Sequence, residues 1–257
     1  MLAPEKFARW VSEHRHVDRR FGHVYRYHSR SDAHSIALCT FVLEDLFHAC
    51  PTLLEQAKRG EIVYGTNANY TWRSTGKTKT LDLAIGPPSG PPQESPLPSR
   101  IGVPSEILVS CEAKSVMTEH GKSQPRVYDE LSSSHEIVHQ GRQDAIATGI
   151  TVVNIADTFV SPLRQTSSET LHVSRHNQPA AAAAMVQHLR GLPIRNAIGE
   201  VGFDAYATIV VDCDNQGEVG LWTGSPAPQP GDRDHYEAFL GRISQFYAER
   251  FSANPPR

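Results

Sequence analysis

Ile107-Leu-Val-Ser-Cys-Glu-Ala-Lys114 is an apolar run that ends in an acid, a small residue and a lysine. Residues two apart on a strand project to the same face of a sheet, so Glu112 and Lys114 should lie side by side. An earlier apolar run, Leu81-Asp82-Leu83, carries a single aspartate. If the two strands are neighbours, two carboxylates and one ammonium group meet on one face. Metal-dependent cleavage of phosphodiester bonds needs that combination, so a nuclease is the leading hypothesis.

The segments around this run predict a regular alternation of helices and strands. A helix should begin at Ser31 or Asp32 and be kinked or divided at Pro51. Prolines crowd the segment 86–104, which we expect to be an irregular excursion at the sheet edge. In order, the predicted elements are a helix over 32–58, strands over 61–72, 78–85 and 106–116, a helix over 125–147 and a strand over 151–156.

The rest of the chain predicts a smaller α+β annex. We expect residues 1–160 to form the core with a helical N-terminal extension, and residues 161–257 to pack on the same domain. The annex should contain a helix near 179–189, strands over 205–211 and 219–222, and a closing helix with an aromatic side. The predicted fold class is therefore α/β, with a mixed central sheet flanked by helices and a C-terminal annex.

Composition limits the classes of protein that fit. The 257 residues are 39% apolar and 21% charged, which is typical of a globular protein, and the net charge of −3 shows no overall basic field. Four cysteines without CxxC spacing indicate buried thiols in a reducing compartment. The N-terminus has no apolar signal core and no run reaches membrane-spanning length, so we expect a cytoplasmic protein with no membrane partner.

The predicted element order and the three polar residues resemble the PD-(D/E)xK nuclease superfamily, to which most type II restriction endonucleases belong. The resemblance implies a restriction-endonuclease-like αβββαβ core in which Asp82, Glu112 and the carbonyl of Ala113 bind one or two Mg²⁺ ions. It implies that Lys114 positions or deprotonates the attacking water. It also suggests Glu44 as an additional acid from the first helix, although a solvated helix glutamate fits equally well. Leu81 stands where the family signature has proline.

The resemblance further implies double-stranded DNA as the substrate and a homodimer as the working form, for which the aromatic side of the closing helix is a candidate interface. The segment 58–79 is basic and aromatic, so it predicts a hairpin that contacts DNA, the alternative being an ordinary solvated strand surface. The predicted phosphate-binding residues are Arg73, Lys77 and Lys79 on this hairpin, and Lys122 and Arg126 after the catalytic strand.

Two alternatives from other classes remain open. His135-Glu-Ile-Val-His139 matches the HExxH pattern, in which two histidines one helical turn apart bind zinc and the glutamate acts as base. Arg142 and Ala145 occupy positions where the extended motif of metzincins needs glycine and histidine, while Glu169 is a possible downstream ligand. The second alternative is a DNA-binding protein that has a nuclease scaffold but does not cleave DNA.

Overall fold

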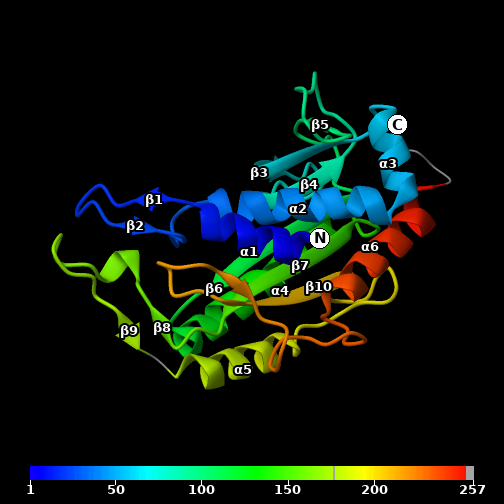
Figure 1. Ribbon diagram of the computed structural model, residues 1–257. Helices are drawn as coiled ribbons and strands as arrows, with labels where there is room; N and C mark the ends of the chain where they lie inside the picture. The colour runs from blue at the N-terminus through cyan, green and yellow to red at the C-terminus, as the bar shows by residue number, and fades with distance from the viewer. Residues whose placement is uncertain (176, 253–257) are drawn as a thin grey trace.

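A mixed seven-stranded sheet forms the centre of the computed structural model, which describes residues 1–175 and 177–252 (Figure 1). Across the sheet the strands are β11 (Gly220–Leu221), β10 (Ala205–Asp212), β7 (Ile146–Asn154), β6 (Val109–Val116), β4 (Thr78–Gly86), β3 (Val63–Thr71) and β5 (Arg100–Ile101). β10, β7 and β6 are parallel, whereas β4 runs antiparallel to both β6 and β3. The predicted α/β class with a mixed sheet flanked by helices is confirmed.

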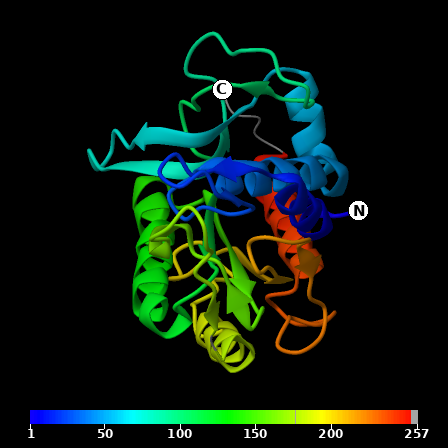
Figure 2. The same ribbon diagram turned by 60° about the vertical axis from the view of Figure 1, so that its left-hand side comes forward.

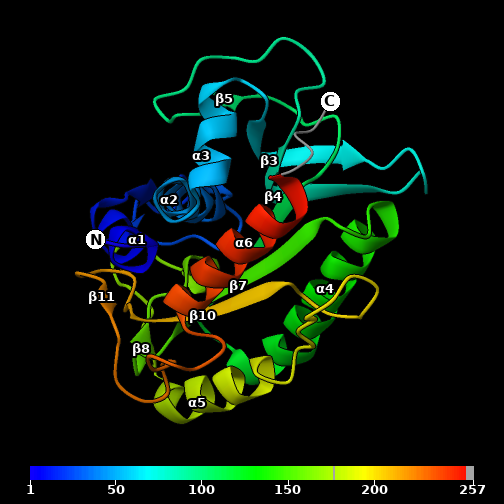
Figure 3. The same cartoon turned by 90° about the vertical axis from the view of Figure 1, so that its right-hand side faces the viewer.

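Helices cover both faces of this sheet (Figures 2 and 3). The helices are α1 (Ala3–Glu13), α2 (Ala33–Ala49), α3 (Pro51–Lys58), α4 (His120–Gly141), α5 (Gln178–Leu189) and α6 (Tyr236–Phe251). The side chains of α1, α2 and α6 form one apolar core with the sheet, and those of α4 and α5 form a second core on the opposite face. Small two-stranded pairs lie outside the sheet: β1 (His16–Val17) with β2 (Val24–Tyr25), and β8 (Thr158–Phe159) with β9 (Ser174–Arg175).

Pro51 divides the first long helical segment, as predicted. α2 ends at Ala49 and α3 begins at Pro51, and the two helices meet at 104°. Cys50 between them is extended, with φ −124° and ψ 92°, because a residue before proline is sterically excluded from the helical region. The proline then takes the first helical position, where its missing N–H has no partner to lose.

The predicted boundaries of the next helix and strand are wrong. α4 begins five residues before Pro125 and ends at Gly141, and the segment from Ile146 onward is strand β7 rather than helix. β7 lies between two parallel strands and is buried along its whole length, so it has no alternation of polar and apolar residues. Gly149 lies within this strand, where a Cβ atom would come within 2.9 Å of the Tyr206 ring.

The region expected to be an annex contributes directly to the central sheet and core. β10 pairs in parallel with β7 over seven residues, so the sheet extends past residue 161. The aromatic side of α6 faces inward: Phe239, Ile243 and Tyr247 are buried in the same core as α2. That side is therefore not available as the dimer interface suggested by the sequence.

The four cysteines are free and buried, as predicted. Within the described residues no single helix is both long and apolar enough to cross a membrane. Only the sharply bent pair α2 and α3, taken together, meets that length and composition.

Candidate active site

Asp82 lies where strands β4 and β6 part. The antiparallel ladder between them pairs Leu83 with Cys111 and continues to Ile85 and Val109, but it does not extend beyond Leu83 toward Asp82. In place of the next ladder bond, the Ala113 N–H donates to Asp82 Oδ2 at 2.9 Å. The aspartate side chain thus satisfies a main-chain donor of the neighbouring strand and is held against the Glu112-Ala113-Lys114 segment.

The backbone around Asp82 is irregular, which explains how its carboxylate reaches β6. Leu81 packs in the core under α4, whereas Leu83, two residues later, packs in the core under α2. A regular strand would place both on one face, so β4 changes face at Asp82. Opposite this point on β3, Asn67 has φ 48°, in the left-handed region that asparagine tolerates, and its Nδ2 donates to Asp32 Oδ2 at 2.8 Å.

Glu112 is the most enclosed charged group of the site, with 5% of its surface exposed. Its Oε1 lies 2.7 Å from Lys114 Nζ, and its Oε2 lies 3.2 Å from Lys79 Nζ. The hydroxyl of Ser134 on α4 also donates to Oε2 at 3.1 Å. A buried carboxylate needs such partners, because desolvation strongly disfavours its ionised form.

The charges of this cluster shift each other's ionisation. Burial and the nearby charge of Glu112 raise the pKa of Asp82 to about 6, although hydrogen bonds from Ala113 and Ser35 and the charge of Lys114 oppose the rise. Burial lowers the pKa of Lys114, but the carboxylates of Glu112, Asp82 and Glu130 outweigh burial and raise it above its usual value. Lys114 is therefore an ammonium ion at neutral pH, and Asp82 binds a proton more readily than an ordinary aspartate.

The donor set at this point fits Mg²⁺ better than Zn²⁺. The N–H and C=O of one strand residue point to the same neighbouring strand, so the Ala113 carbonyl faces the side on which Asp82 lies. Within the described residues no three His, Cys, Asp or Glu side chains gather to hold a metal. A cation bound to Asp82 and Glu112 would thus depend on the carbonyl and on water for its other ligands, which Mg²⁺ accepts.

Glu44, predicted as an additional catalytic acid, lies elsewhere. Its Oε2 pairs with Lys6 of α1 at 2.9 Å. Glu44 lies nine positions along α2 from Ser35, the α2 residue beside Asp82, which corresponds to about 13 Å along the axis. As its helical spacing predicts, Glu44 lies at the border of the apolar stripe of α2. Its neighbour at this position along the helix is α1, and not the strands β4 and β6 that carry the site.

Lys79, predicted as a DNA-binding residue, lies inside the site on Glu112. Strand alternation would put residues 79 and 82 on opposite faces, so only the change of face at Asp82 brings Lys79 to the carboxylates. Ser134 and Glu130 of α4 are further site residues that the sequence does not predict, and Glu130 Oε2 lies 3.4 Å from Lys114 Nζ. No local sequence signal identifies them, because α4 meets the sheet only through tertiary packing.

The other predicted DNA contacts are surface cations around the site. Arg73 and Lys77 are exposed at the end of the β3–β4 hairpin, where Lys77 Nζ donates to Gln140 Oε1 of α4 at 2.7 Å. On α4, Lys122 pairs with Glu119 at 2.8 Å, and Arg126 lies 3.8 Å from the Glu130 that also contacts Lys114. Arg126 is thus linked to the site through one carboxylate.

The HExxH residues do not form a zinc site in the structure. His135 and His139 lie 6.1 Å apart between ring centroids, but Glu136 is exposed. His135 packs edge-on against Phe203, and His139 Nε2 lies 3.1 Å from Asp204 Oδ2. The structure does not support the zinc-peptidase alternative, because the motif serves packing and a buried ion-pair network.

Burial of His135 predicts a loss of stability in acid. Burial and the nearby charges of His139 and Arg195 lower the pKa of His135 to about 4, against about 6.5 for an ordinary histidine. The unfolded chain then binds the proton at higher pH, so the free energy of unfolding falls as pH drops from about 6.5 toward 4. Between pH 7.5 and 5.0 we expect His135 to account for a loss of about 2 kcal/mol.

Urea unfolding of His135→Leu at both pH values checks this expectation. The variant should lose less stability on acidification than the wild type, whereas His48→Leu, at an exposed position on α2, should keep the wild-type pH dependence. Equal pH dependence of wild type and His135→Leu would contradict the assignment.

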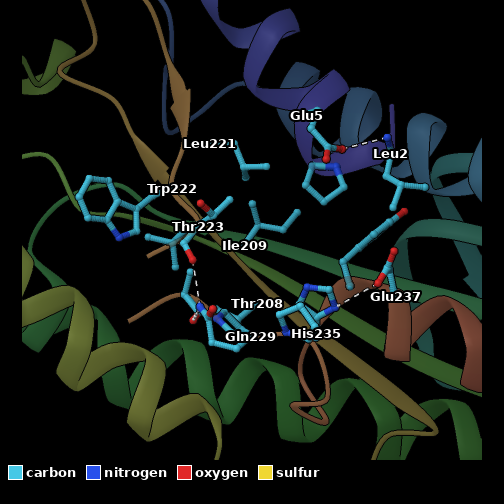
Figure 4. A pocket seen from close by; sticks show the side chains of 16 residues that line it. Leu2, Glu5, Thr208, Ile209, Leu221, Trp222, Thr223, Gln229, His235 and Glu237 are labelled. Carbon is cyan, nitrogen blue, oxygen red and sulfur yellow. Dashed lines mark hydrogen bonds and ion pairs between the residues drawn. The ribbon is translucent and has the colours of Figure 1, made fainter. Parts of the chain in front are cut away.

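A separate hollow of about 350 Å³ lies between the start of α1, strands β10 and β11 and the start of α6 (Figure 4). Leu221, Ile209 and Trp222 line it together with several prolines, and at its border His235 Nδ1 lies 3.9 Å from Glu237 Oε2. None of the site residues on β4 and β6 lines this hollow, whose two lining acids are Glu5 and Glu237.

No protein-family model matches the chain, and no curated protein or solved structure shows significant similarity to it. The function is therefore inferred from the geometry and charge of the site.

Proposed function

We propose that the protein is a Mg²⁺-dependent endonuclease that hydrolyses phosphodiester bonds in double-stranded DNA. The observation that supports this best is the 2.9 Å contact between the Ala113 N–H and Asp82 Oδ2, which brings an aspartate of one strand against the Glu-x-Lys segment of the next. Two carboxylates, a strand carbonyl and an ammonium group then lie close together where the interior strands β4 and β6 part. That set of groups is suited to phosphate chemistry assisted by a hard cation.

The arrangement of elements supports a nuclease of the PD-(D/E)xK type, and within it a type II restriction-like enzyme. From α2 to β7 the chain follows the order helix, two hairpin strands, site strand, helix, strand, apart from the short helix α3 and the two-residue β5. Asp82 lies on the second hairpin strand and Glu112 on the site strand, as the family pattern requires. The resemblance also implies that the protein acts as a homodimer, with one active site for each DNA strand.

Asp82, Glu112 and the Ala113 carbonyl are the groups that would hold Mg²⁺. The bound ion would supply an acidified water molecule and stabilise negative charge on the phosphate. Because the pKa of Asp82 is raised to about 6, cation binding and proton binding compete at this carboxylate near neutral pH. The two lysines hold the Glu112 carboxylate in place through ion pairs.

Lys114 supports the reaction through its charge. Its raised pKa means that it is protonated at neutral pH, so it cannot accept a proton from water unless it first loses its own. As an ammonium ion it can donate a hydrogen bond to the attacking water or to a phosphate oxygen, and its charge offsets the charge that develops on the phosphate. We therefore favour positioning and charge stabilisation by Lys114 over a role as general base.

Lys79, like Lys114, should affect the rate of the chemical step. In Lys79→Ala, Glu112 loses one of its two cations, and we expect kcat to fall about tenfold, as for loss of a group that orients a metal ligand. Lys77→Ala removes an exposed lysine two residues away, whose ammonium group donates to Gln140 Oε1 on α4. It should leave kcat near the wild-type value. Single-turnover cleavage of a labelled duplex compares the two variants, and equal loss in both would show that Lys79 acts only as a surface cation.

The proposed activity is tested directly by incubating the purified protein with phage and plasmid DNA, modified and unmodified, in Mg²⁺ and in EDTA. Discrete fragments that require Mg²⁺ would support a restriction-like enzyme, and smears with the same requirement would indicate a non-specific nuclease. DNA that is bound but intact in every metal would leave the non-catalytic alternative. Intact DNA together with stoichiometric zinc in the purified protein would rule out the proposal. It would instead favour the zinc-peptidase alternative, in which Glu136 acts as the base.

A further inference from the structure

Residues His14–Arg30, which we call the basic hairpin, carry a local charge opposite in sign to that of the whole chain. The segment holds a single acid, Asp18, in a protein of net charge −3. Its basic residues are Arg15, Arg19, Arg20, Arg26 and Arg30, together with His14, His16, His23 and His28. Such a cluster creates a local positive potential that the overall charge conceals.

The basic hairpin projects from the body of the protein as strands β1 and β2 (Figure 1). Its register pairs His16 with Tyr25, and the Asp18 carboxylate accepts the backbone N–H of Arg20 and of Phe21 to close the turn. The single acid thus holds the turn together through backbone donors. Arg19 and Arg20 are exposed at the tip, where the Arg20 guanidinium lies over the Phe21 ring at 4.7 Å.

The guanidinium groups of the basic hairpin have no carboxylate partners among the residues that the structure describes. Arg26 donates to the carbonyl of Gly217 at 3.0 Å, and Arg15 donates to carbonyls at the end of α1. Elsewhere on the protein, cations such as Arg59, Arg142 and Arg190 pair with acids. Uncompensated charge of one sign, held together on one hairpin, fits an anionic polymer better than it fits a role in folding.

The base of the hairpin is firmly attached. Asn215 is fully buried, and its Nδ2 donates to the carbonyls of Tyr27 and Val160 at 3.0 and 2.8 Å, while its Oδ1 accepts the Tyr27 N–H at 2.6 Å. His23 Nε2 lies 2.7 Å from the Ser167 carbonyl. A hairpin held in this way presents its arginines in a defined place, so it loses little conformational entropy when it binds.

The hairpin returns to the body beside the candidate active site. Tyr27 is buried next to Ser115, which follows Lys114 on β6, and near Arg126 of α4, and burial raises the pKa of this tyrosine to about 12. His34, one residue before the Ser35 that contacts Asp82, lies with its Nε2 3.0 Å from the Arg26 carbonyl. The basic hairpin therefore leaves the body of the protein next to the site strand and Arg126.

We propose that the basic hairpin is a phosphate-binding arm that grips the DNA backbone next to the cleavage site, an inference that rests on the proposed nuclease function. Arginine guanidinium groups bind phosphate oxygens through two parallel hydrogen bonds. The arm contributes affinity without sequence specificity, because phosphates are the same at every base pair.

Equilibrium binding of a fluorescent 30-base-pair duplex in EDTA, followed by anisotropy at several salt concentrations, tests the arm without cleavage. Arg19→Gln/Arg20→Gln removes two tip cations, and Arg100→Gln/Arg233→Gln removes two exposed cations, on β5 and just before α6, away from the hairpin (Figure 1). If the arm binds two phosphates, the slope of log K against log salt should decrease by about 1.8, with affinity about tenfold or more weaker near 0.1 M salt. The control pair should bind as the wild type does.

Three results would overturn the proposal that the basic hairpin binds DNA. The first is equal duplex affinity of the Arg19/Arg20 variant and the control, and the second is no duplex binding by the wild type. The third is tighter binding of the wild type to phosphatidylserine vesicles than to the duplex. Thermal unfolding of each variant excludes loss of fold as the cause of weak binding. Because binding is measured in EDTA, the two proposals fail separately. Binding that depends on the arm, without cleavage in Mg²⁺, would refute only the nuclease, whereas cleavage with arm-independent binding would refute only the arm.

Discussion

Glu112→Gln should lower Mg²⁺-dependent DNA cleavage about a thousandfold or more. The substitution keeps the size of the side chain but removes the negative charge that pairs with Lys114 and Lys79 and that raises the pKa of Asp82. A bound metal ion contributes several kcal/mol to stabilisation of the transition state, and each 1.36 kcal/mol corresponds to a factor of about ten in rate. Single-turnover cleavage of a labelled duplex in saturating Mg²⁺ measures the loss.

Glu130→Gln is the matched control for this variant. Glu130 also contacts Lys114, at 3.4 Å, but 41% of its side chain is exposed, so its charge is screened by water. We expect its cleavage rate to stay within a few-fold of the wild type. Comparable loss in both variants would show that the cluster acts only through general electrostatics, and full activity of Glu112→Gln would exclude Glu112 as a metal ligand. Thermal unfolding confirms that each variant is folded.

Asp204→Asn should destabilise the folded protein severely. Asp204 is fully buried, and its carboxylate contacts Arg195 at 2.9 Å, Arg250 at 2.8 Å and His139 at 3.1 Å, besides the N–H of Ala147. Asparagine keeps the shape but leaves two buried guanidinium groups without a counter-charge. Removing one partner of a buried ion pair costs about 3–5 kcal/mol, which corresponds to roughly 10 °C in Tm for a chain of this size.

The pH at which this loss should be measured follows from the pKa of Asp204. Burial raises that pKa, but hydrogen bonds from His139 and Arg195 and the charge of Arg250 more than offset burial, so the pKa lies below its usual value. The stability that the charged form contributes is therefore present above about pH 4 and is lost as pH falls through the folded-state pKa. Calorimetry at pH 7.5 compares Asp204→Asn with Asp232→Asn, whose carboxylate pairs with Arg190 at the surface and whose replacement should leave Tm almost unchanged. A Tm of Asp204→Asn equal to that of the wild type would contradict a stabilising role for this carboxylate.

Most elements were predictable wherever a local pattern had a single structural meaning. The division at Pro51, the strands around Tyr64 and Leu83, and the closing helix all followed from proline geometry, alternation or helical spacing. The boundaries of α4 and β7 did not, because a strand buried on both faces lacks alternation, and Gly149 there resembles a residue that ends a helix. The place of β10 beside β7 also had no local signal, since a parallel partner is chosen by the packing of the whole sheet.

Local sequence patterns were enough to identify the reactive groups: an aspartate within one apolar strand, and a glutamate and a lysine two apart on another. Strand alternation alone places Glu112 and Lys114 together. The assembly of these groups into one site depends on tertiary contacts. The change of face of β4 at Asp82 brings Lys79 onto Glu112, α4 adds Ser134 and Glu130, and the packing of α1 on α2 draws Glu44 away to Lys6. The physical reason is that alternation and helical period act over a few residues, whereas strand divergence and helix docking depend on contacts between segments far apart in the chain.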